Sequence, residues 1–194
     1  MTARLIATDG TAMHLDVERW MAEPSSAERA VLDRTSGPVL DVGCGPGRHV
    51  LALARAGRLA LGIDASPSAV DLARSRGAPV LLRSIFERVP GAGRWGSALL
   101  LDGNIGIGGD PPLLLSRIAC LLRSAGRVLM EVEVPGASSR MLTARLETSE
   151  GIGLDFPWAV VGADDAPDLA RRSGFSVREL WSEEGRWFAE LVSR

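Results

Sequence analysis

A glycine-rich turn between two acidic residues is the part of the sequence best suited to chemistry. Residues 41–47 read DVGCGPG, after a short apolar run and before a helical stretch. Gly43 and Gly45 carry no side chain, so a ligand bound at the carboxyl end of a strand could approach the backbone closely. Asp64, 21 residues after Gly43, ends the next apolar run. A carboxylate there can accept hydrogen bonds from both hydroxyls of a ribose, so the pattern predicts a nucleoside site.

The details of the turn indicate which nucleotide it would take. A dinucleotide-binding turn has a third Gly or Ala where this chain has Arg48. Asp41, just before the first glycine, is not part of that fingerprint, and its carboxylate can face an ammonium group. These two residues favour a ligand with an amino group over a nicotinamide dinucleotide.

The elements that must position this turn alternate between apolar runs and helical stretches. Strands are predicted at residues 38–42, 59–63, 79–83, 97–101 and 126–134, with helices at 49–56, 66–76 and 113–123. Residues 164–173 predict a further helix, and 175–181 and 186–192 predict an antiparallel hairpin. This order predicts an α/β fold: a Rossmann-like, doubly wound, mostly parallel seven-stranded sheet with an antiparallel C-terminal hairpin and helices on both faces.

Two segments lie outside this alternation. Residues 13–34 are expected to be largely helical, which makes residues 1–36 an N-terminal helical cover. Residues 138–161 are expected to form a hairpin lid, because apolar and polar residues alternate around a Ser-Glu-Gly turn. Residues 141–146 would also fit a helix, so periodicity alone leaves both structures open. The whole chain, residues 1–194, is expected to be one domain, with residues 162–194 forming its C-terminal helix and hairpin.

Three segments resemble the class I S-adenosylmethionine-dependent methyltransferases, and in particular their small, bacterial-type, small-molecule branch. Residues 39–47 (VLDVGCGPG) resemble the first motif of that family, and residues 61–67 (LGIDASP) its second strand with the ribose-binding acid. Residues 126–132 (GRVLMEV) are similar to its fifth strand. The resemblance covers residues 36–194, with sharp motifs only in the first third, and makes residues 37–134 the cofactor-binding half.

The resemblance implies a role for each cofactor-site residue. Gly43 and Gly45 would lie against the methionine part, Asp41 would hold its amino group through water, and Asp64 would bind the ribose. The turn also contributes Cys44, which is expected to pack rather than react, and Gly47. Around the adenine the resemblance places Ala65, Ser66, Ser84, Ile85 and Phe86. The family often has an acid at the position of Ser84, and Phe86 would fit a core position as well as the ring face.

The acceptor is expected beside residues 102–110 (DGNIGIGGD), which follow the fourth predicted strand. Asp102 could act as a base or orient the acceptor, or it could contact only the cofactor or backbone amides. Asn104 is the only Asn of the chain, although Asn is also common in ordinary turns. His14 in the N-terminal cover is a candidate base. The candidate lid residues are Trp20, Phe156 and Trp158.

The amino-acid composition indicates which classes of partner the protein could bind. The chain has 194 residues, a net charge of −2, no Lys and no Tyr. An acidic pI of about 5.8 argues against nucleic acid, and no apolar stretch is long enough to span a membrane. Two cysteines fit a reducing cytoplasm, and no metal-ligand spacing is present. The Asp110-Pro111-Pro112-Leu113 sequence lacks the aromatic of a nitrogen-methylating motif and is explained as a helix start.

The sequence therefore predicts transfer of a methyl group from S-adenosylmethionine to an oxygen, nitrogen or carbon of a small-molecule acceptor, by a monomer or homodimer. A module or sensor that binds this cofactor without turning it over is the alternative. A nicotinamide-dependent oxidoreductase is disfavoured by Arg48 and by the missing Tyr-Lys pair.

Overall fold

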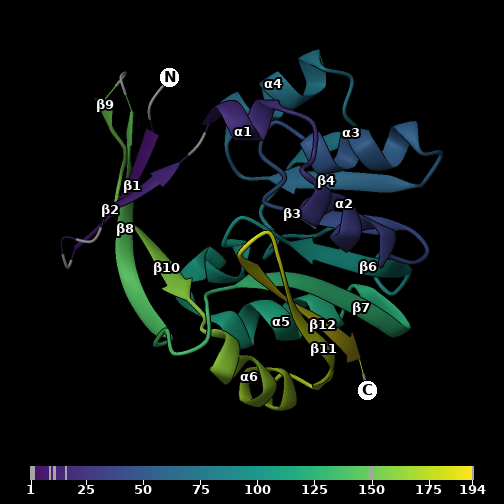
Figure 1. Cartoon of the computed structure of the whole chain (residues 1–194). Coiled ribbons are helices and arrows are strands. Elements are labelled where there is room, and N and C mark those ends of the chain that lie inside the picture. The colour runs from purple at the N-terminus through teal and green to yellow at the C-terminus, as the bar shows by residue number, and fades with distance from the viewer. Residues whose placement is uncertain (1–2, 9, 11, 16, 149–150, 194) are drawn as a thin grey trace.

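A seven-stranded sheet forms the centre of the molecule (Figure 1). The computed structural model describes residues 3–8, 10, 12–15, 17–148 and 151–193. The strand order is β11-β12-β7-β6-β3-β4-β5, in which β7, β6, β3, β4 and β5 are parallel and the hairpin β11–β12 is antiparallel. The bounds are β3 Val39–Val42, β4 Ala60–Asp64, β5 Val80–Leu82, β6 Trp95–Leu100, β7 Leu122–Val132, β11 Phe175–Glu183 and β12 Arg186–Ser193. The predicted fold class is confirmed.

Helices cover both faces of this sheet because its parallel strands are apolar on both sides. Helices α2, α3 and α4 pack on one face and α5 and α6 on the other. Their bounds are α2 Ser26–Asp33, α3 Arg48–Arg55, α4 Pro67–Ser75, α5 Pro111–Ala119 and α6 Ala166–Arg172, with short 3-10 helices at Asn104–Gly109 and Ala163–Asp165. Asp110 caps α5 by accepting from the Leu113 amide at 2.9 Å, so the Asp-Pro-Pro sequence is a helix start.

A second, smaller sheet stands beside the first, at the left of Figure 1. It has the order β10-β8-β1-β2, with β9 paired to β8. The bounds are β1 Ala3–Ala7, β2 Ala12–Leu15, β8 Arg140–Thr148, β9 Gly151–Ile152 and β10 Phe156–Val160. Strands β8 and β10 are antiparallel, and residues 141–146 are therefore strand rather than helix. No helix in the described ranges is long and apolar enough to cross a membrane.

The prediction of a largely helical N-terminal cover is wrong for its first part. The chain begins with strands β1 and β2, and only α1 (Val17–Met21) and α2 are helical. Strand β8 pairs with β10 along one edge and with β1 along the other, where Leu5 lies opposite Leu146. Leu5 and Ala7 are buried whereas Arg4 is exposed, the period-two burial of a half-covered strand. The partner that stabilises β1 lies about 140 residues away, so local periodicity could not reveal it.

Candidate functional site

The glycine turn between β3 and α3 has one constrained side and one open side. Gly43, Gly45 and Gly47 all have positive φ, at 71°, 52° and 81°. A Cβ on Gly43 would lie 2.8 Å from Asn104 Nδ2, whereas a Cβ on Gly45 would meet nothing within 4 Å. The turn therefore needs glycine both for its backbone and for close packing, and a ligand could approach it at Gly45.

Asp64, the last residue of β4, fastens the turn to the neighbouring strand. Its carboxylate accepts hydrogen bonds from the amides of Gly45 and Ser66, each at 2.8 Å. Burial raises the pKa of Asp64, and the two backbone amides oppose that rise. Each carboxylate oxygen can accept more than one hydrogen bond, so Asp64 fits the hydroxyls of a ribose bound beside the turn.

A buried carboxylate lies beneath the turn. Asp41 is 1% exposed, and its Oδ2 has no hydrogen bond among the described residues. His49 Nδ1 lies 3.6 Å from Asp41 Oδ2, and His49 Nε2 lies 3.9 Å from Glu28 Oε2. Burial alone would lower the pKa of His49, but the two carboxylates raise it to about 9. His49 is therefore held between two acids, and Asp41 Oδ2, the oxygen without a hydrogen bond, is the one that faces His49.

The segment predicted to meet the adenine lies after β5. The Ser84 amide donates to Glu87 Oε2 at 3.0 Å, and the Phe86 amide donates to the Ser84 hydroxyl at 3.3 Å. Ile85 is buried, whereas Phe86 is 42% exposed and is not a core residue. The ring of Phe86 packs on Gly108, where a Cβ would lie 2.8 Å from it. Glu87 places a carboxylate beside Ser84, where the family often has an acid.

The cysteine of the turn and two neighbours of Asp64 are placed as follows. Cys44 is buried against β4, since a Cβ on Gly62 would lie 2.6 Å from its sulfur, and burial raises the pKa of the Cys44 thiol. Ser66 caps α4 by accepting from the Ala69 amide at 3.3 Å. Ala65 lies between Asp64 and this cap. These contacts fit packing and helix-starting roles for Cys44 and Ser66.

Asp102, which follows β6, is fully engaged by basic side chains. Its φ is 56°, and its oxygens lie 2.7 Å from Arg48 Nη2 and 3.2 Å from Arg186 Nη2. Its backbone amide donates to Glu131 Oε2 at 2.7 Å. These contacts fit a carboxylate that orients the loop after β6.

Asn104 acts on the glycine turn from the opposite side. Its Nδ2 donates to the carbonyls of Val42 and Gly43, both at 2.9 Å. Two hydrogen bonds from one amide hold the start of the turn against the loop after β6. This contact is to the protein backbone, a role that the position of Asn104 in the sequence did not reveal.

The candidate lid residues come from two elements. Phe156 and Trp158 lie on β10 with ring centroids 6.0 Å apart, edge to face. A Cβ on Gly106 would lie 2.8 Å from the Trp158 ring, so β10 packs directly on the loop after β6. Trp20 is half-buried on α1. His14 lies on β2 opposite Arg4 in the register, and its side chain is outside the described part of the structure.

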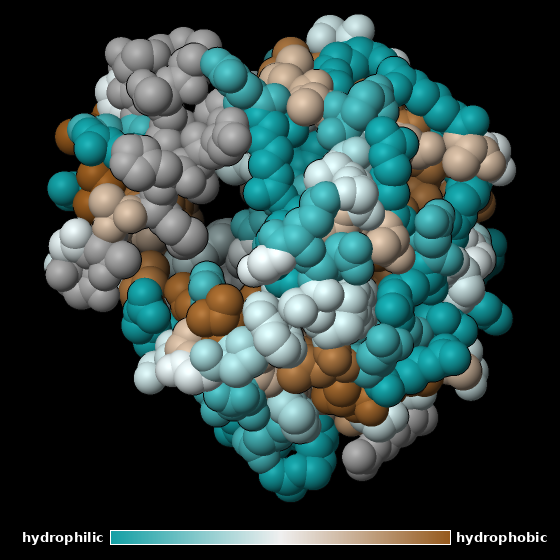
Figure 2. Space-filling model, viewed as in Figure 1, coloured by the Kyte–Doolittle hydropathy of each residue, from teal (hydrophilic) through white to brown (hydrophobic). Residues whose placement is uncertain are grey.

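A cavity of about 280 Å³ lies at the carboxyl ends of β6 and β7. Figure 2 shows the surface hollowed between the smaller sheet and the body of the main sheet. The cavity lining comes from the loop after β6, the end of β7, β10 and the β11–β12 hairpin: Asp102, Gly103, Ile105, Glu131, Val132, Glu133, Val134, Trp158, Ala159, Val160, Val161, Gly185, Arg186 and Trp187. It therefore combines two indole rings with three carboxylates and one guanidinium.

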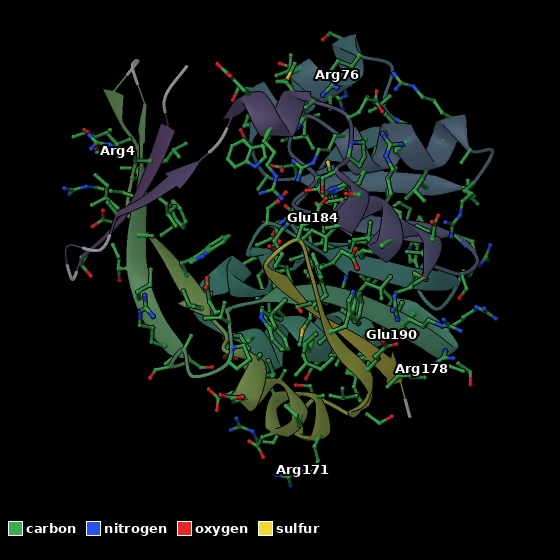
Figure 3. All side chains as sticks on the ribbon, viewed as in Figure 1. Arg4, Arg76, Arg171, Arg178, Glu184 and Glu190 are labelled. Carbon is green, nitrogen blue, oxygen red and sulfur yellow. The ribbon has the colours of Figure 1, made fainter. Side chains whose placement is uncertain are left out.

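A buried ionic network connects this cavity with the N-terminal helices. Glu28, on α2, lies 2.7 Å from Arg48 and from Arg19, and 2.8 Å from Arg186. Burial would raise the pKa of Glu28, but His49 and the guanidinium groups hold it far below its ordinary range. The hairpin that carries Arg186 is itself tied to α2, since Glu184 at its tip accepts from the Ser26 hydroxyl and points toward α2 (Figure 3).

Sequence reasoning missed this network. Glu28 matches a capping box with Ser25, which explains its presence without any contact to distant residues. Arg186 carries no local signal at all. Glu131, a charge inside the apolar segment 128–132 of β7, is the one local hint. Among the described residues, no group of His, Cys, Asp and Glu side chains could hold a metal ion.

Comparisons with known proteins agree with this geometry. Residues 39–89 match the family model described as a methyltransferase domain. A SAM-dependent methyltransferase from Bacteroides fragilis, solved with S-adenosyl-L-homocysteine, is 24% identical with a TM-score of 0.84, covering 100% of this chain and 89% of that one. The 1,6-didemethyltoxoflavin-N1-methyltransferase of Burkholderia thailandensis is 20% identical with a TM-score of 0.65, covering 92% and 81%. A sugar N-methyltransferase from Streptoalloteichus is 18% identical with a TM-score of 0.66, covering 92% and 90%. The family match and the shared fold confirm the resemblance stated from the sequence.

Proposed function

We propose that this chain, whose residues 39–89 match the methyltransferase-domain family and whose fold is that of S-adenosylmethionine-dependent methyltransferases, methylates a small molecule. The observation that carries the proposal is the cavity of about 280 Å³ beside the loop that Asn104 joins to the glycine turn. That volume is at the lower end of the range for small-molecule sites. The net charge of −2 gives no general attraction to nucleic acid.

The cofactor is S-adenosylmethionine, which supplies a methyl group on a positively charged sulfur. The open side of the turn at Gly45 admits the methionine part, and Asp64 holds the ribose. Asp41, buried beneath the turn with its Oδ2 facing His49, meets the amino group through water. Phe86, half-exposed beside Gly108, covers the adenine. These donors and acceptors fit the cofactor's own groups.

The protein's part in the reaction is alignment and exclusion of water. As the acceptor's lone pair forms the new bond to the methyl carbon, the carbon–sulfur bond breaks and its electron pair stays on sulfur. Trp158 and β10 close the acceptor side of the loop after β6. Asp102 orients that loop rather than taking a proton, because both of its oxygens face guanidinium groups. His14 remains a candidate general base. The expected compartment is still a reducing cytoplasm.

Transfer of a labelled methyl group tests the proposal. Purified protein is incubated with methyl-labelled S-adenosylmethionine and a cell extract that has been separated by size into small molecules and macromolecules. We expect label in the small-molecule fraction, and at least about a hundredfold less with Asp64→Ala. Label only in macromolecules would contradict the small-molecule acceptor. Cofactor binding without any label in either fraction would favour the non-catalytic module.

A further inference from the structure

The cavity carries one negative charge that the protein leaves uncompensated. Three carboxylates and three guanidinium groups form the buried network at its inner wall, and their charges cancel: Glu28, Asp102 and Glu131 against Arg19, Arg48 and Arg186. Glu133, two residues further along the chain, lines the same cavity. No ion pair to Glu133 is formed within the described ranges, and the residue is exposed, so its carboxylate is open to solvent as well as to the cavity.

Arg186, the only basic residue in the lining, is not free to bind an anionic acceptor. Its Nε and Nη2 donate to Glu131 at 2.7 and 2.6 Å. Its Nη1 donates to Glu28 at 2.8 Å, and its Nη2 also reaches Asp102 at 3.2 Å. A guanidinium with every nitrogen already bonded to a carboxylate offers an anion little attraction. The cavity therefore selects against negatively charged acceptors.

The surroundings of Glu133 add to its negative charge. Its backbone is fixed by hydrogen bonds between its amide and the Val161 carbonyl and between its carbonyl and the Ala163 amide. Asp164 and Asp165 lie close by in the chain fold, where they accept from the amides of Gly136 and Ser139. Arg140 shares with Glu133 the lining of a second cavity of about 160 Å³, without forming an ion pair with it. Glu133 is thus held at the junction of the two cavities.

Two indole side chains in the lining complete a site for a cation. Trp158 and Trp187 line the cavity together with Glu133. Indole rings attract cations through the negative potential of their faces, most strongly among the aromatic side chains. A carboxylate beside aromatic walls is the combination that binds organic ammonium groups, because the rings stabilise the alkyl part and the charge together.

We propose that the methyl acceptor carries a positively charged nitrogen group, an alkylammonium or amidinium, and that Glu133 is the residue that selects for it. The inference rests on the proposed function, since it names the acceptor class of the same cavity. Glu133 accepts hydrogen bonds from the charged group while the atom to be methylated lies toward Gly103, at the end of β6. Glu133 touches the acceptor and not the cofactor, so its loss leaves the cofactor affinity unchanged.

Three ring compounds of matched size provide the test, each titrated at pH 7 into protein saturated with S-adenosylhomocysteine. Benzylamine is a cation, benzyl alcohol is its neutral counterpart and benzoate is an anion. We expect benzylamine to bind at least about tenfold more tightly than benzyl alcohol, and benzoate not to bind. In Glu133→Gln the preference for benzylamine disappears. The control Glu23→Gln, at an exposed residue paired with Arg55, keeps it.

Each other outcome overturns the inference. Equal binding of benzylamine and benzyl alcohol, tighter binding of benzoate, or binding of none of the three would show that the cavity does not select a cation. A preference that survives in Glu133→Gln would show that another group carries it. Binding of S-adenosylhomocysteine, measured first on each variant, separates this result from a failure of the proposed function.

Discussion

Asn104 is predicted to hold the cofactor-binding turn, and its removal should weaken cofactor binding without any acceptor present. Its Nδ2 makes two hydrogen bonds of 2.9 Å, to the carbonyls of Val42 and Gly43. A typical hydrogen bond contributes about 1 kcal/mol net, so Asn104→Ala should remove about 2 kcal/mol of support from the turn. If all of this were lost from binding, the dissociation constant of S-adenosylhomocysteine would rise by about 30-fold.

Part of the loss will appear in the free energy of unfolding, because the turn has this geometry in the protein without ligand. We therefore expect the dissociation constant to rise about 3- to 30-fold. The remainder of the roughly 2 kcal/mol should be lost from the free energy of unfolding. Calorimetric titration and urea denaturation of the same samples measure the two parts. Asn104→Asp, which keeps the size but replaces the donor by an acceptor, should be at least as damaging. Wild-type values for both quantities in Asn104→Ala would refute the reasoning. Asn104 would then again be a candidate for contact with the methyl acceptor.

Three further substitutions test other contacts. Gly106→Ala places a Cβ 2.1 Å from a β10 carbonyl oxygen, where at least 3.0 Å is needed. The substitution should cost about 1–3 kcal/mol of unfolding free energy. The control Gly153→Ala, whose Cβ would make only ordinary contacts, should cost far less. His49 has a folded-state pKa of about 9 against an ordinary 6.5, so its stabilisation is complete below pH 6.5 and lost as the pH rises through 9. A stability–pH curve should therefore fall by up to about 3 kcal/mol over that range, and His49→Gln should remove the slope. Arg186→Met should cost about 3–5 kcal/mol in urea denaturation, because it leaves buried carboxylates unpaired, and a loss below 1 kcal/mol would contradict that role.

The sequence predicted the parts of the fold that depend on local order. The alternation of apolar runs and helical stretches indicated the seven-stranded sheet, and the glycine turn with Asp64 indicated where a nucleoside would lie. Both signals lie in short stretches of sequence. A parallel strand buried on both faces reads as a continuous apolar run. The start of the chain could not be predicted in the same way, because β1 exists only through its pairing with β8.

The acceptor side depended on contacts between distant residues. The position of Asp102 in the sequence fits a base, yet Arg48 and Arg186, 54 and 84 residues away, bind its carboxylate. No spacing rule connects a loop after one strand with a guanidinium on a later hairpin. That Glu133 has no ion pair among the described residues likewise depends on distant contacts, because Arg186 is bonded to Glu28, Asp102 and Glu131 instead.

Binding of S-adenosylhomocysteine is the measurement that tests the account most directly. Calorimetric titration of the wild type should show micromolar affinity. Asp64→Ala should abolish it, because the carboxylate both fastens the turn and meets the ribose. Asp71→Ala, an exposed acid on α4 whose side chain lies 3.8 Å from Arg74, should bind as the wild type does. A wild type that does not bind, or an Asp64→Ala variant that binds unchanged, would contradict the central claim.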